Sequence, residues 1–236
     1  MKKFIFLCLF LPFHLIAANI AVVSMAIGDN YIEDVMPGID SKRAYCDMHG
    51  YDFFCASESL DPTRHVVWSK ILFIKEVMNQ GTYDWIFWTD ADAVICNPTI
   101  KLEDLIDDNF DVIISKDFYG INAGHFFIKC CDWSLAFLDK VYRHTDCINH
   151  IWREQRAIIV EYKKAAMKTH FKIIPQRLIN SYSPEKTYNA KFQLDDVIYQ
   201  PGDFLIHFPD HHTGYYNLLN KYSFLNNPEY VPPTNE

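Results

Sequence analysis

The 236-residue chain lacks an excess of positive charge: 22 Lys and Arg stand against 30 Asp and Glu, for a formal net charge of −8. A protein that binds nucleic-acid phosphates needs a basic face, so the composition argues against a nucleic-acid partner. Charged residues make up only 22% of the chain and apolar residues 50%, which excludes a disordered chain and supplies a sizeable core. The length fits one domain, or one domain with a small appendage.

The sequence also lacks internal repeats, low-complexity tracts and zinc-type cysteine spacing. No CxxC pair or His/Cys cluster has the separation that zinc sites use. Of the seven cysteines, Cys8 lies in an apolar N-terminal segment. The other six form an even set that permits disulfides in an oxidising compartment, with the pairing left open: Cys46, Cys55, Cys96, Cys130, Cys131 and Cys147.

A long apolar run is absent except near the N-terminus, where Lys2 and Lys3 precede apolar residues 4–18. That run is too short to span a bilayer comfortably and is typical of a secretory signal peptide. Extension into residues 19–27 would give a signal anchor, but residues 19–26 also have the character of a buried strand. We therefore expect cleavage or anchoring before Asn19, a protein of the secretory pathway or associated with a membrane, and any membrane contact within residues 4–18.

Apolar runs and helical periodicities alternate along the rest of the chain. This alternation predicts an α/β fold with right-handed βαβ units and a single, mostly parallel sheet flanked by helices. We expect a globular domain over residues 19–225 and an extended, proline-containing tail over 226–236. The expected strands are 19–26, 51–56, 85–89, 112–115, 124–129, 171–174 and 204–208; the expected helices are 41–49, 67–79, 133–142 and 154–168; and residues 28–34 are expected to form a loop.

Two carboxylates one residue apart, Asp90 and Asp92, directly follow the apolar run of residues 85–89. The carboxyl ends of parallel strands are where open α/β sheets bind ligands. Hard divalent cations take oxygen ligands and commonly share them with substrate phosphates, so this pair can hold Mg²⁺ or Mn²⁺ against a diphosphate. A bound cation would also offset the charge of a diphosphate on an acidic protein. A D-x-D pair alone is a weak pattern, and its place after a buried strand strengthens it.

A phosphatase of the haloacid-dehalogenase type is an alternative for the same residues. Asp90 would then attack phosphorus and Asp92 would serve as acid and base. Asp195 and Asp196 could supply a late acidic motif. In that family, however, the motif usually ends the first strand, whereas about 90 residues precede it here.

A series of motifs in one order resembles glycosyltransferase family 34, which includes fungal α-mannosyl- and α-galactosyltransferases and plant xyloglucan α-xylosyltransferases. Together the matching segments cover nearly all of residues 41–208, and eight in register are far more specific than one. They are SKRAY at 41–45 leading to HGYD at 49–52, WSK at 68–70, WIFWTDAD at 85–92, NAGHFFIK at 122–129, WS at 133–134, WREQ at 152–155, IPQRLINSY at 174–182 and GDFLIHF at 202–208.

The resemblance implies a GT-A fold and an enzyme that transfers a hexosyl or pentosyl group from a UDP- or GDP-sugar to a glycan acceptor. It also implies Mn²⁺ dependence and retention of anomeric configuration. It assigns Asp90, Asp92 and His207 to the metal, and the two aspartates also to the diphosphate. It assigns Lys70 and Gly124 to binding of the donor. It places Asn122, Glu154 and Gln155 in the active centre. Relatives often carry a basic residue after the late histidine; here His212 would take that role, in a segment that departs from the pattern.

Several alternatives stay open at the level of the residues. His207 alone is more often a packed histidine than a ligand, although its place at a strand end suits a neutral imidazole ligand for Mn²⁺. Glu154 could be a helix N-terminal carboxylate or the nucleophile of a double displacement; front-face displacement needs no such nucleophile. A non-catalytic, exported carbohydrate-binding protein is another alternative, disfavoured by the full metal-binding set. In a eukaryotic cell, the need for nucleotide sugar favours a Golgi-like lumen.

Overall fold

The computed structural model describes residues 18–185, 196–209 and 214–227. The expected signal segment, His212, Asp195 and most of the expected C-terminal tail therefore lie outside the described residues. Among the helices of the described ranges, none combines the length and the apolar character needed to cross a bilayer. All six cysteines in these ranges are thiols.

The centre of the molecule is a six-stranded sheet in the order β2-β1-β3-β6-β5-β7. Strand β1 pairs in parallel with β2 and β3, β5 pairs in parallel with β7, and β6 runs antiparallel to both of its neighbours. The α/β fold with a mostly parallel, helix-flanked sheet is thus confirmed. The strands are β1 (Ile20–Met25), β2 (Asp52–Ala56), β3 (Trp85–Thr89), β5 (Val112–Asp117), β6 (Gly120–Lys129) and β7 (Phe171–Ile174).

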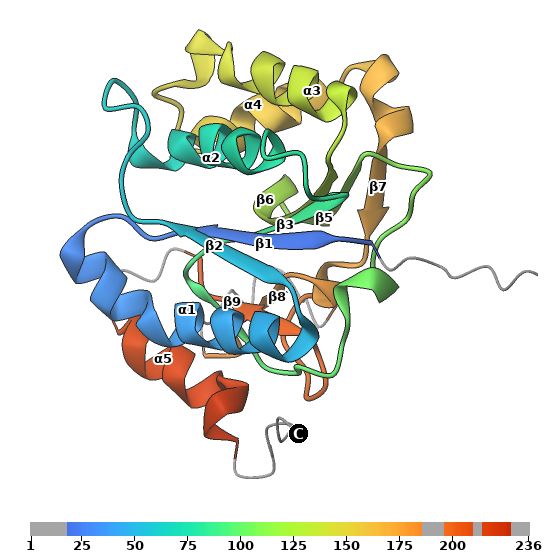
Figure 1. The fold of residues 1–236 in the computed structure, drawn as a ribbon. Helices are drawn as coiled ribbons and strands as arrows, with labels where there is room; N and C mark the ends of the chain where they lie inside the picture. The colour runs from blue at the N-terminus through green and yellow to red at the C-terminus, as the bar shows by residue number, and fades with distance from the viewer. Residues whose placement is uncertain (1–17, 186–195, 210–213, 228–236) are drawn as a thin grey trace, which may run out of the picture.

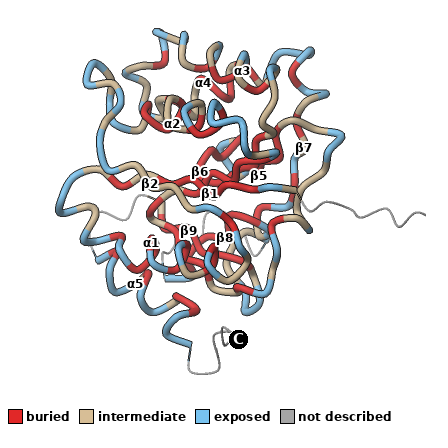
Figure 2. Tube along the Cα trace, viewed as in Figure 1, coloured by how far each residue is buried: buried red, intermediate tan, exposed pale blue. Residues whose placement is uncertain are grey.

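Helices cover both faces of this sheet (Figure 1). On one face lie α2 (Ser69–Met78), α3 (Asp132–Tyr142) and α4 (Arg153–Tyr162); on the other lie α1 (Asp29–His49) and α5 (Tyr215–Tyr222). An apolar core lies between each face of the sheet and the helices that cover it, and alternate residues of β1 point into the two cores. Ala21 and Val23 belong to one core, and Ile20 and Val22 belong to the other. The inner strands β1 and β3 are therefore buried on both faces, as Figure 2 shows for β1, which explains why they are continuous apolar runs.

A second, three-stranded sheet lies on the α1 side, in the order β4-β9-β8. It consists of β4 (Ala93–Ile95), β8 (Ser181–Tyr182) and β9 (Leu205–His207). Antiparallel pairing sets Ala93 opposite His207. Of these three strands, only β9 was predicted, as residues 204–208 of a single sheet; β4 and β8 were missed because strands of two or three residues leave no period to detect. This small sheet is nevertheless what brings the late histidine beside the Asp-Ala-Asp turn.

The predicted loop at residues 28–34 is wrong, because α1 begins at Asp29 and continues to His49. Pro37 lies inside this helix although proline removes a helical hydrogen bond. Burial of Val35, Pro37 and Ile39 offsets that loss. The predicted helix at 154–168 ends at Tyr162, and a 3₁₀ segment follows. The 3₁₀ segments are η1 (Val66–Trp68), η2 (Leu102–Asp104), η3 (Thr145–Cys147), η4 (Ala165–His170), η5 (Gln176–Leu178) and η6 (Phe224–Asn226).

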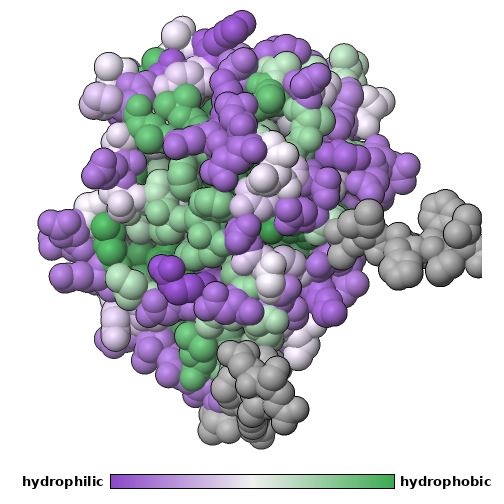
Figure 3. Space-filling view, viewed as in Figure 1, coloured by the Kyte–Doolittle hydropathy of each residue, from purple (hydrophilic) through white to green (hydrophobic). Residues whose placement is uncertain are grey.

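Polar and apolar residues occupy different parts of the face drawn in Figure 3. Figure 3 shows hydrophilic residues over the helical layers on one face, with hydrophobic residues gathered across its middle at the level of the central sheet. The edge strand β2 lies at that level, and its residues from Phe53 to Ala56 are half-buried. Asp52 at its start is exposed and accepts a hydrogen bond from Tyr83 Oη.

Candidate functional site

The Asp-Ala-Asp turn joins β3 to β4 at the carboxyl end of β3. Its backbone is held from two sides: Asp90 N–H donates to the Gly124 carbonyl of β6 over 2.9 Å, and Phe208 N–H donates to the Asp92 carbonyl over 2.9 Å. The indole N–H of Trp88 donates to Asp90 Oδ1 over 2.7 Å. These bonds fix the turn and aim its carboxylates at a common point beyond the edge of the sheet.

Asp90, Asp92 and His207 each offer a ligand atom, and these atoms all lie within 4.8 Å of one another. His207 is the last residue of β9 and is only 3% exposed. Its Nδ1 lies 2.8 Å from Asn180 Oδ1, an atom that can only accept, so Nδ1 carries a hydrogen and Nε2 is the ring nitrogen left for a proton or a metal ion. That Nε2 faces Asp92 Oδ1 at 3.4 Å.

A lone pair on His207 Nε2 and one on Asp92 Oδ1 would repel each other in this largely buried place unless a proton or a metal ion lies between them. Burial alone would raise the pKa of Asp92, but the charge of His207, its hydrogen bond and the charge of Lys42 hold that pKa below its ordinary value. Two carboxylates and an oriented imidazole form a donor set that suits a divalent transition metal. The residues present therefore fit a metal ion.

Lys70 links the Asp-Ala-Asp turn (residues 90–92, called the aspartate turn below) to α4. Its Nζ lies 3.2 Å from Asp90 Oδ1 and 3.0 Å from Glu154 Oε1, and it donates to the Ala123 carbonyl over 3.0 Å. Burial lowers the pKa of this ammonium, but the two carboxylates outweigh burial and raise it, so Lys70 is a cation. Burial raises the pKa of Glu154, partly opposed by Lys70. The buried charges are thus paired, as the low polarity of the site requires.

The start of β6 carries the predicted Asn122 and Gly124. The Asn122 amide donates to Asp117 Oδ2 and to Tyr182 Oη over 2.8 Å each, and its carbonyl accepts from Gly124 N–H over 2.9 Å. Tyr182 Oη donates to Asp117 Oδ2 over 2.7 Å, which closes a triangle of hydrogen bonds. A Cβ on residue 124 would lie 2.5 Å from the His207 ring, so glycine is required there for the histidine to reach the turn.

Glu154 and Gln155 lie in the first turn of α4, which packs against β6. Gln155 Oε1 accepts from Ala123 N–H over 2.9 Å, so its side chain is tied to the same strand that holds the aspartate turn. The first residue of this helix is strained: Arg153 has φ +37°, in the left-handed region that favours glycine. Such strain tends to occur where surrounding structure fixes a functional conformation.

These side chains line one pocket, which has a volume of about 370 Å³. A second pocket of about 350 Å³ adjoins it, at the carboxyl end of β1, and shares Lys70, Asp90, Asp92 and Glu154 with the first. The aspartate turn therefore lies between two recesses. The predicted site residues that line the first pocket are Lys70, Asp90, Asp92, Asn122, Gly124, Glu154, Gln155 and His207.

The sequence profile of the galactosyl transferase GMA12/MNN10 family matches residues 16–109 and 107–213, which is most of the chain. The chain belongs to this family. Galactomannan galactosyltransferase 1 of Cyamopsis tetragonoloba is 30% identical over 109 residues, covering 42% of this chain and 25% of that protein. An uncharacterised alpha-1,2-galactosyltransferase of Schizosaccharomyces pombe is 26% identical over 215 residues, covering 72% of this chain and 54% of that protein. The chain thus spans between a quarter and about half of the length of these relatives.

Solved structures show the same fold. A glycosyltransferase involved in glycosylation of the major capsid of PBCV-1 aligns with a TM-score of 0.64 at 17% identity, over 85% of this chain and 97% of that one. The glycosyltransferase GlyE of Streptococcus pneumoniae aligns with a TM-score of 0.51 at 15% identity, over 79% and 53%. The GT-A fold and the predicted family are confirmed, and neither the phosphatase nor the non-catalytic alternative is favoured.

Sequence reasoning missed the support that α1 gives to the aspartate turn. Lys42 is fully buried, and its Nζ donates to the carbonyls of Ala91, Ala93 and, within the helix, Gly38. A Cβ on Gly38 would lie 2.5 Å from the Ala93 carbonyl oxygen, so only glycine lets the helix approach the turn so closely. The signal in the sequence is Lys42 at helical spacing from Val35, Gly38 and Ile39, on a helical face that is otherwise apolar.

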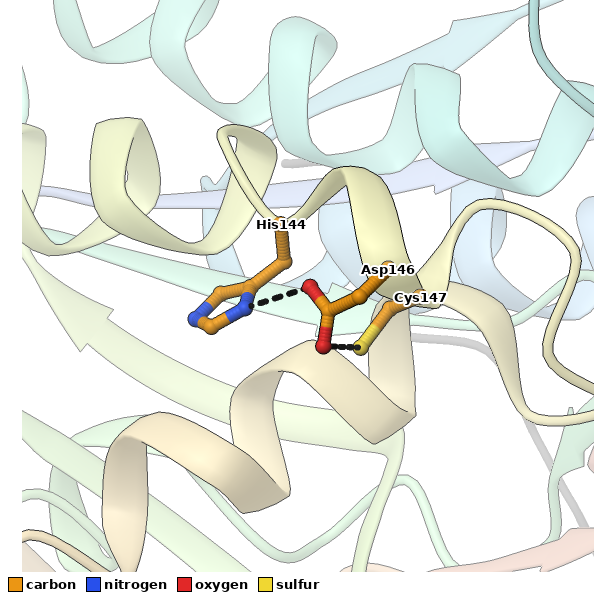
Figure 4. Close-up of side chains that lie close together, drawn as sticks. All are labelled: His144, Asp146 and Cys147. Carbon is orange, nitrogen blue, oxygen red and sulfur yellow. Dashed lines mark hydrogen bonds and ion pairs between the residues drawn. The ribbon is translucent and has the colours of Figure 1, made fainter.

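A second group of candidate metal ligands lies at the α3–α4 connection: His144, Asp146 and Cys147 (Figure 4). His144 Nδ1 lies 3.1 Å from Asp146 Oδ1, and Cys147 Sγ lies 3.8 Å from Asp146 Oδ2. The second ring nitrogen of His144 lies 2.7 Å from Oε1 of buried Glu161. Burial, with the charge of Asp146, raises the pKa of the Cys147 thiol. These side chains bond to one another and tie the connection to α4.

Proposed function

We propose that this protein is a retaining glycosyltransferase that moves a hexosyl or pentosyl group from a UDP- or GDP-sugar to a hydroxyl of a glycan. The observation that carries the proposal is the donor set of Asp90, Asp92 and His207 in a pocket with Lys70 beside it, in a chain of a glycosyltransferase family. Binding alone would not need a metal-binding set placed to meet a diphosphate.

Asp90, Asp92 and His207 would hold the divalent cation. GT-A enzymes generally use a nucleotide-sugar donor and a divalent metal, and an imidazole in the donor set favours Mn²⁺ over Mg²⁺. When bound, the cation would supply positive charge against the negative charge that develops on the leaving diphosphate. Asn180 would act on His207 by keeping its hydrogen on Nδ1, which leaves Nε2 as the ligand atom.

In the proposed transfer, the bond between the anomeric carbon and the β-phosphate oxygen breaks, and a bond to the acceptor oxygen forms on the same face. The acceptor's proton passes to the departing phosphate oxygen. Lys70 would add charge stabilisation near Asp90. Asn122 and Gln155, each held by hydrogen bonds to fixed neighbours, would orient the donor sugar. Glu154 is engaged by Lys70, an arrangement that supports a positioning role and a front-face displacement.

The organisation of the chain completes the proposal. Residues 1–18 would be a signal peptide or signal anchor, 19–225 the catalytic domain and 226–236 an extended tail. The secretory pathway, with a Golgi-like lumen in a eukaryotic cell, would then supply the nucleotide sugar. His212 would add a basic group near the diphosphate.

The test is release of nucleotide diphosphate from a panel of UDP- and GDP-sugars with and without Mn²⁺, in wild type and in Asp92→Asn. The variant keeps the shape of the side chain but removes its charge, so Mn²⁺-dependent release should fall about 100-fold or more while the fold is retained. Asp40→Asn, an exposed change on α1, is the matched control and should behave as wild type. Near-normal release by Asp92→Asn would overturn the assignment, and a covalent phosphate on Asp90 would restore the phosphatase alternative.

A further inference from the structure

The three most exposed large hydrophobic side chains in the described ranges line the same pocket. Ile151 is 78% exposed, Tyr119 60% and Phe118 58%. Single exposed hydrophobic residues are ordinary, but several gathered at the mouth of one pocket indicate a binding surface. They flank the pocket whose polar residues include Asp90, Asp92 and His207.

Two segments far apart in the sequence build this rim, and both are held in place. Phe118 and Tyr119 form the turn between β5 and β6, where Asp117 Oδ1 accepts from Tyr119 N–H over 2.7 Å. Ile151 and Trp152 precede α4 and the strained Arg153, with Trp152 N–H donating to His150 Nδ1 over 3.0 Å. The rings of Tyr119 and Trp152 meet with centroids 5.5 Å apart. The aromatic surface is therefore formed before any ligand arrives.

We propose that Phe118, Tyr119, Ile151 and Trp152 form the acceptor subsite and stack on the C–H face of a pyranose ring at the end of a glycan. This inference rests on the proposed function. An aromatic face is negative and the C–H groups of a pyranose are slightly positive, so the two surfaces attract while the sugar hydroxyls stay free at the ring edge. Asp117, a carboxylate that lines the same pocket next to Phe118, is placed to bond those hydroxyls.

The geometry separates this subsite from the nucleotide. The aspartate turn lies between the two recesses, so a diphosphate on the turn leaves one recess for the nucleoside and the other for the acceptor. The aromatic rim borders only the first recess. An acceptor at the end of a longer glycan needs an exposed approach, and the exposed side chains of this rim provide it.

The test compares the double variant Phe118→Ala/Tyr119→Ala with Tyr216→Ala, a matched control that removes a 50% exposed aromatic ring on α5, outside both pockets. The donor is the nucleotide sugar that wild type hydrolyses fastest. The acceptors are α-mannobiose, β-1,4-mannotetraose and cellotetraose, with saturation-transfer NMR on the same compounds as the binding measurement. The double variant should hydrolyse donor at the wild-type rate while its KM for acceptor rises about 10-fold. Tyr216→Ala should change neither.

Each failure has its own signature. An unchanged acceptor KM in the double variant, with donor hydrolysis intact, overturns the subsite and leaves the glycosyltransferase assignment standing. Loss of donor hydrolysis in the double variant overturns it too, because the rim would then serve the donor. A wild type that hydrolyses donor but neither glycosylates nor binds any of the three oligosaccharides overturns the pyranose-stacking class. A wild type that hydrolyses no donor overturns the proposed function, and the subsite with it.

Discussion

His207 is the residue on which the metal assignment depends most, because a buried histidine is ordinarily a packing residue. Its surroundings differ from those of a packing residue in two ways. Asn180 fixes its ring hydrogen on one side, and its free nitrogen faces a carboxylate on the other. Gly124 is needed for the ring to lie where it does. Both contacts place Nε2 beside a carboxylate, where a proton or a metal ion can lie between the two atoms.

Replacing His207 with Phe should separate ligation from packing. The variant keeps a ring in a 3% exposed position but has no ligand atom, and it leaves the buried Asn180 Oδ1 without its donor. We expect a folded protein whose free energy of unfolding is lower by about 1–3 kcal/mol. Affinity for Mn²⁺ with nucleotide diphosphate present should fall roughly 10- to 100-fold or more, with part of the turnover restored at high Mn²⁺. Calorimetric titration of the folded variant measures this. Unchanged affinity would remove His207 from the site and leave only the two aspartates.

At the scale of elements, α1 packs against the Asp-Ala-Asp turn and supports it. Gly38 lets the helix backbone approach the turn, and Lys42 donates to carbonyls on either side of Asp92. Ser41 contributes by accepting from Ile95 N–H over 3.2 Å. Burial lowers the pKa of Lys42 to about 8, against the opposing charge of Asp92. The helix thus places a desolvated ammonium where it can hold the turn rigid.

Lys42→Met should therefore damage a site that the side chain never enters. Methionine keeps most of the stem, but the carbonyls of Ala91 and Ala93 lose their donor and the turn gains freedom. Nucleotide release should fall roughly 10- to 100-fold, as small misplacements of catalytic groups do. Mn²⁺ affinity should fall with it. Arg43→Met, the exposed neighbour on the same helix, is the control and should match wild type in both measurements. Wild-type Mn²⁺ affinity in Lys42→Met would mean that Lys42 only packs.

How far the sequence predicts these elements depends on how each signal is encoded. The buried strand β3 and its two aspartates are local patterns, and they were predicted together. The role of Lys42 depends on a helix and a turn meeting across the fold, which no local period reveals. The start of α1 was missed because Pro37 argues against a helix there, while burial of its neighbours decides in favour. The short strands β4 and β8 owe their pairing to tertiary contacts.

At the scale of the whole molecule, α4 ties its helical layer to the sheet and to α3. Glu161 on α4 is 2% exposed, accepts from Lys164 Nζ over 2.5 Å, and lies 2.7 Å from His144 Nε2 at the end of α3. Burial alone would raise the pKa of Glu161, but the hydrogen bonds from Lys164 and His144 outweigh it and lower the pKa. A carboxylate whose pKa is lower in the folded state stabilises that state above its unfolded pKa of about 4.5.

Acid should therefore lower the free energy of unfolding through Glu161. The stability that its carboxylate contributes is complete above pH 4.5 and is lost as the pH falls through the lower pKa of the folded state. Glu161→Gln cannot ionise, so it should be less stable than wild type by about 1–3 kcal/mol at pH 7, where charged hydrogen bonds are lost. Below pH 4.5 the difference in free energy of unfolding between wild type and Glu161→Gln should become smaller, because wild type loses the charge that the variant never had. Urea unfolding between pH 3 and 7 measures both curves. Glu76→Gln, an exposed change on α2, is the control, and its free energy of unfolding should follow that of wild type across this pH range. If the difference between Glu161→Gln and wild type stays constant with pH, the ionised carboxylate is not what stabilises the packing of α4 on α3.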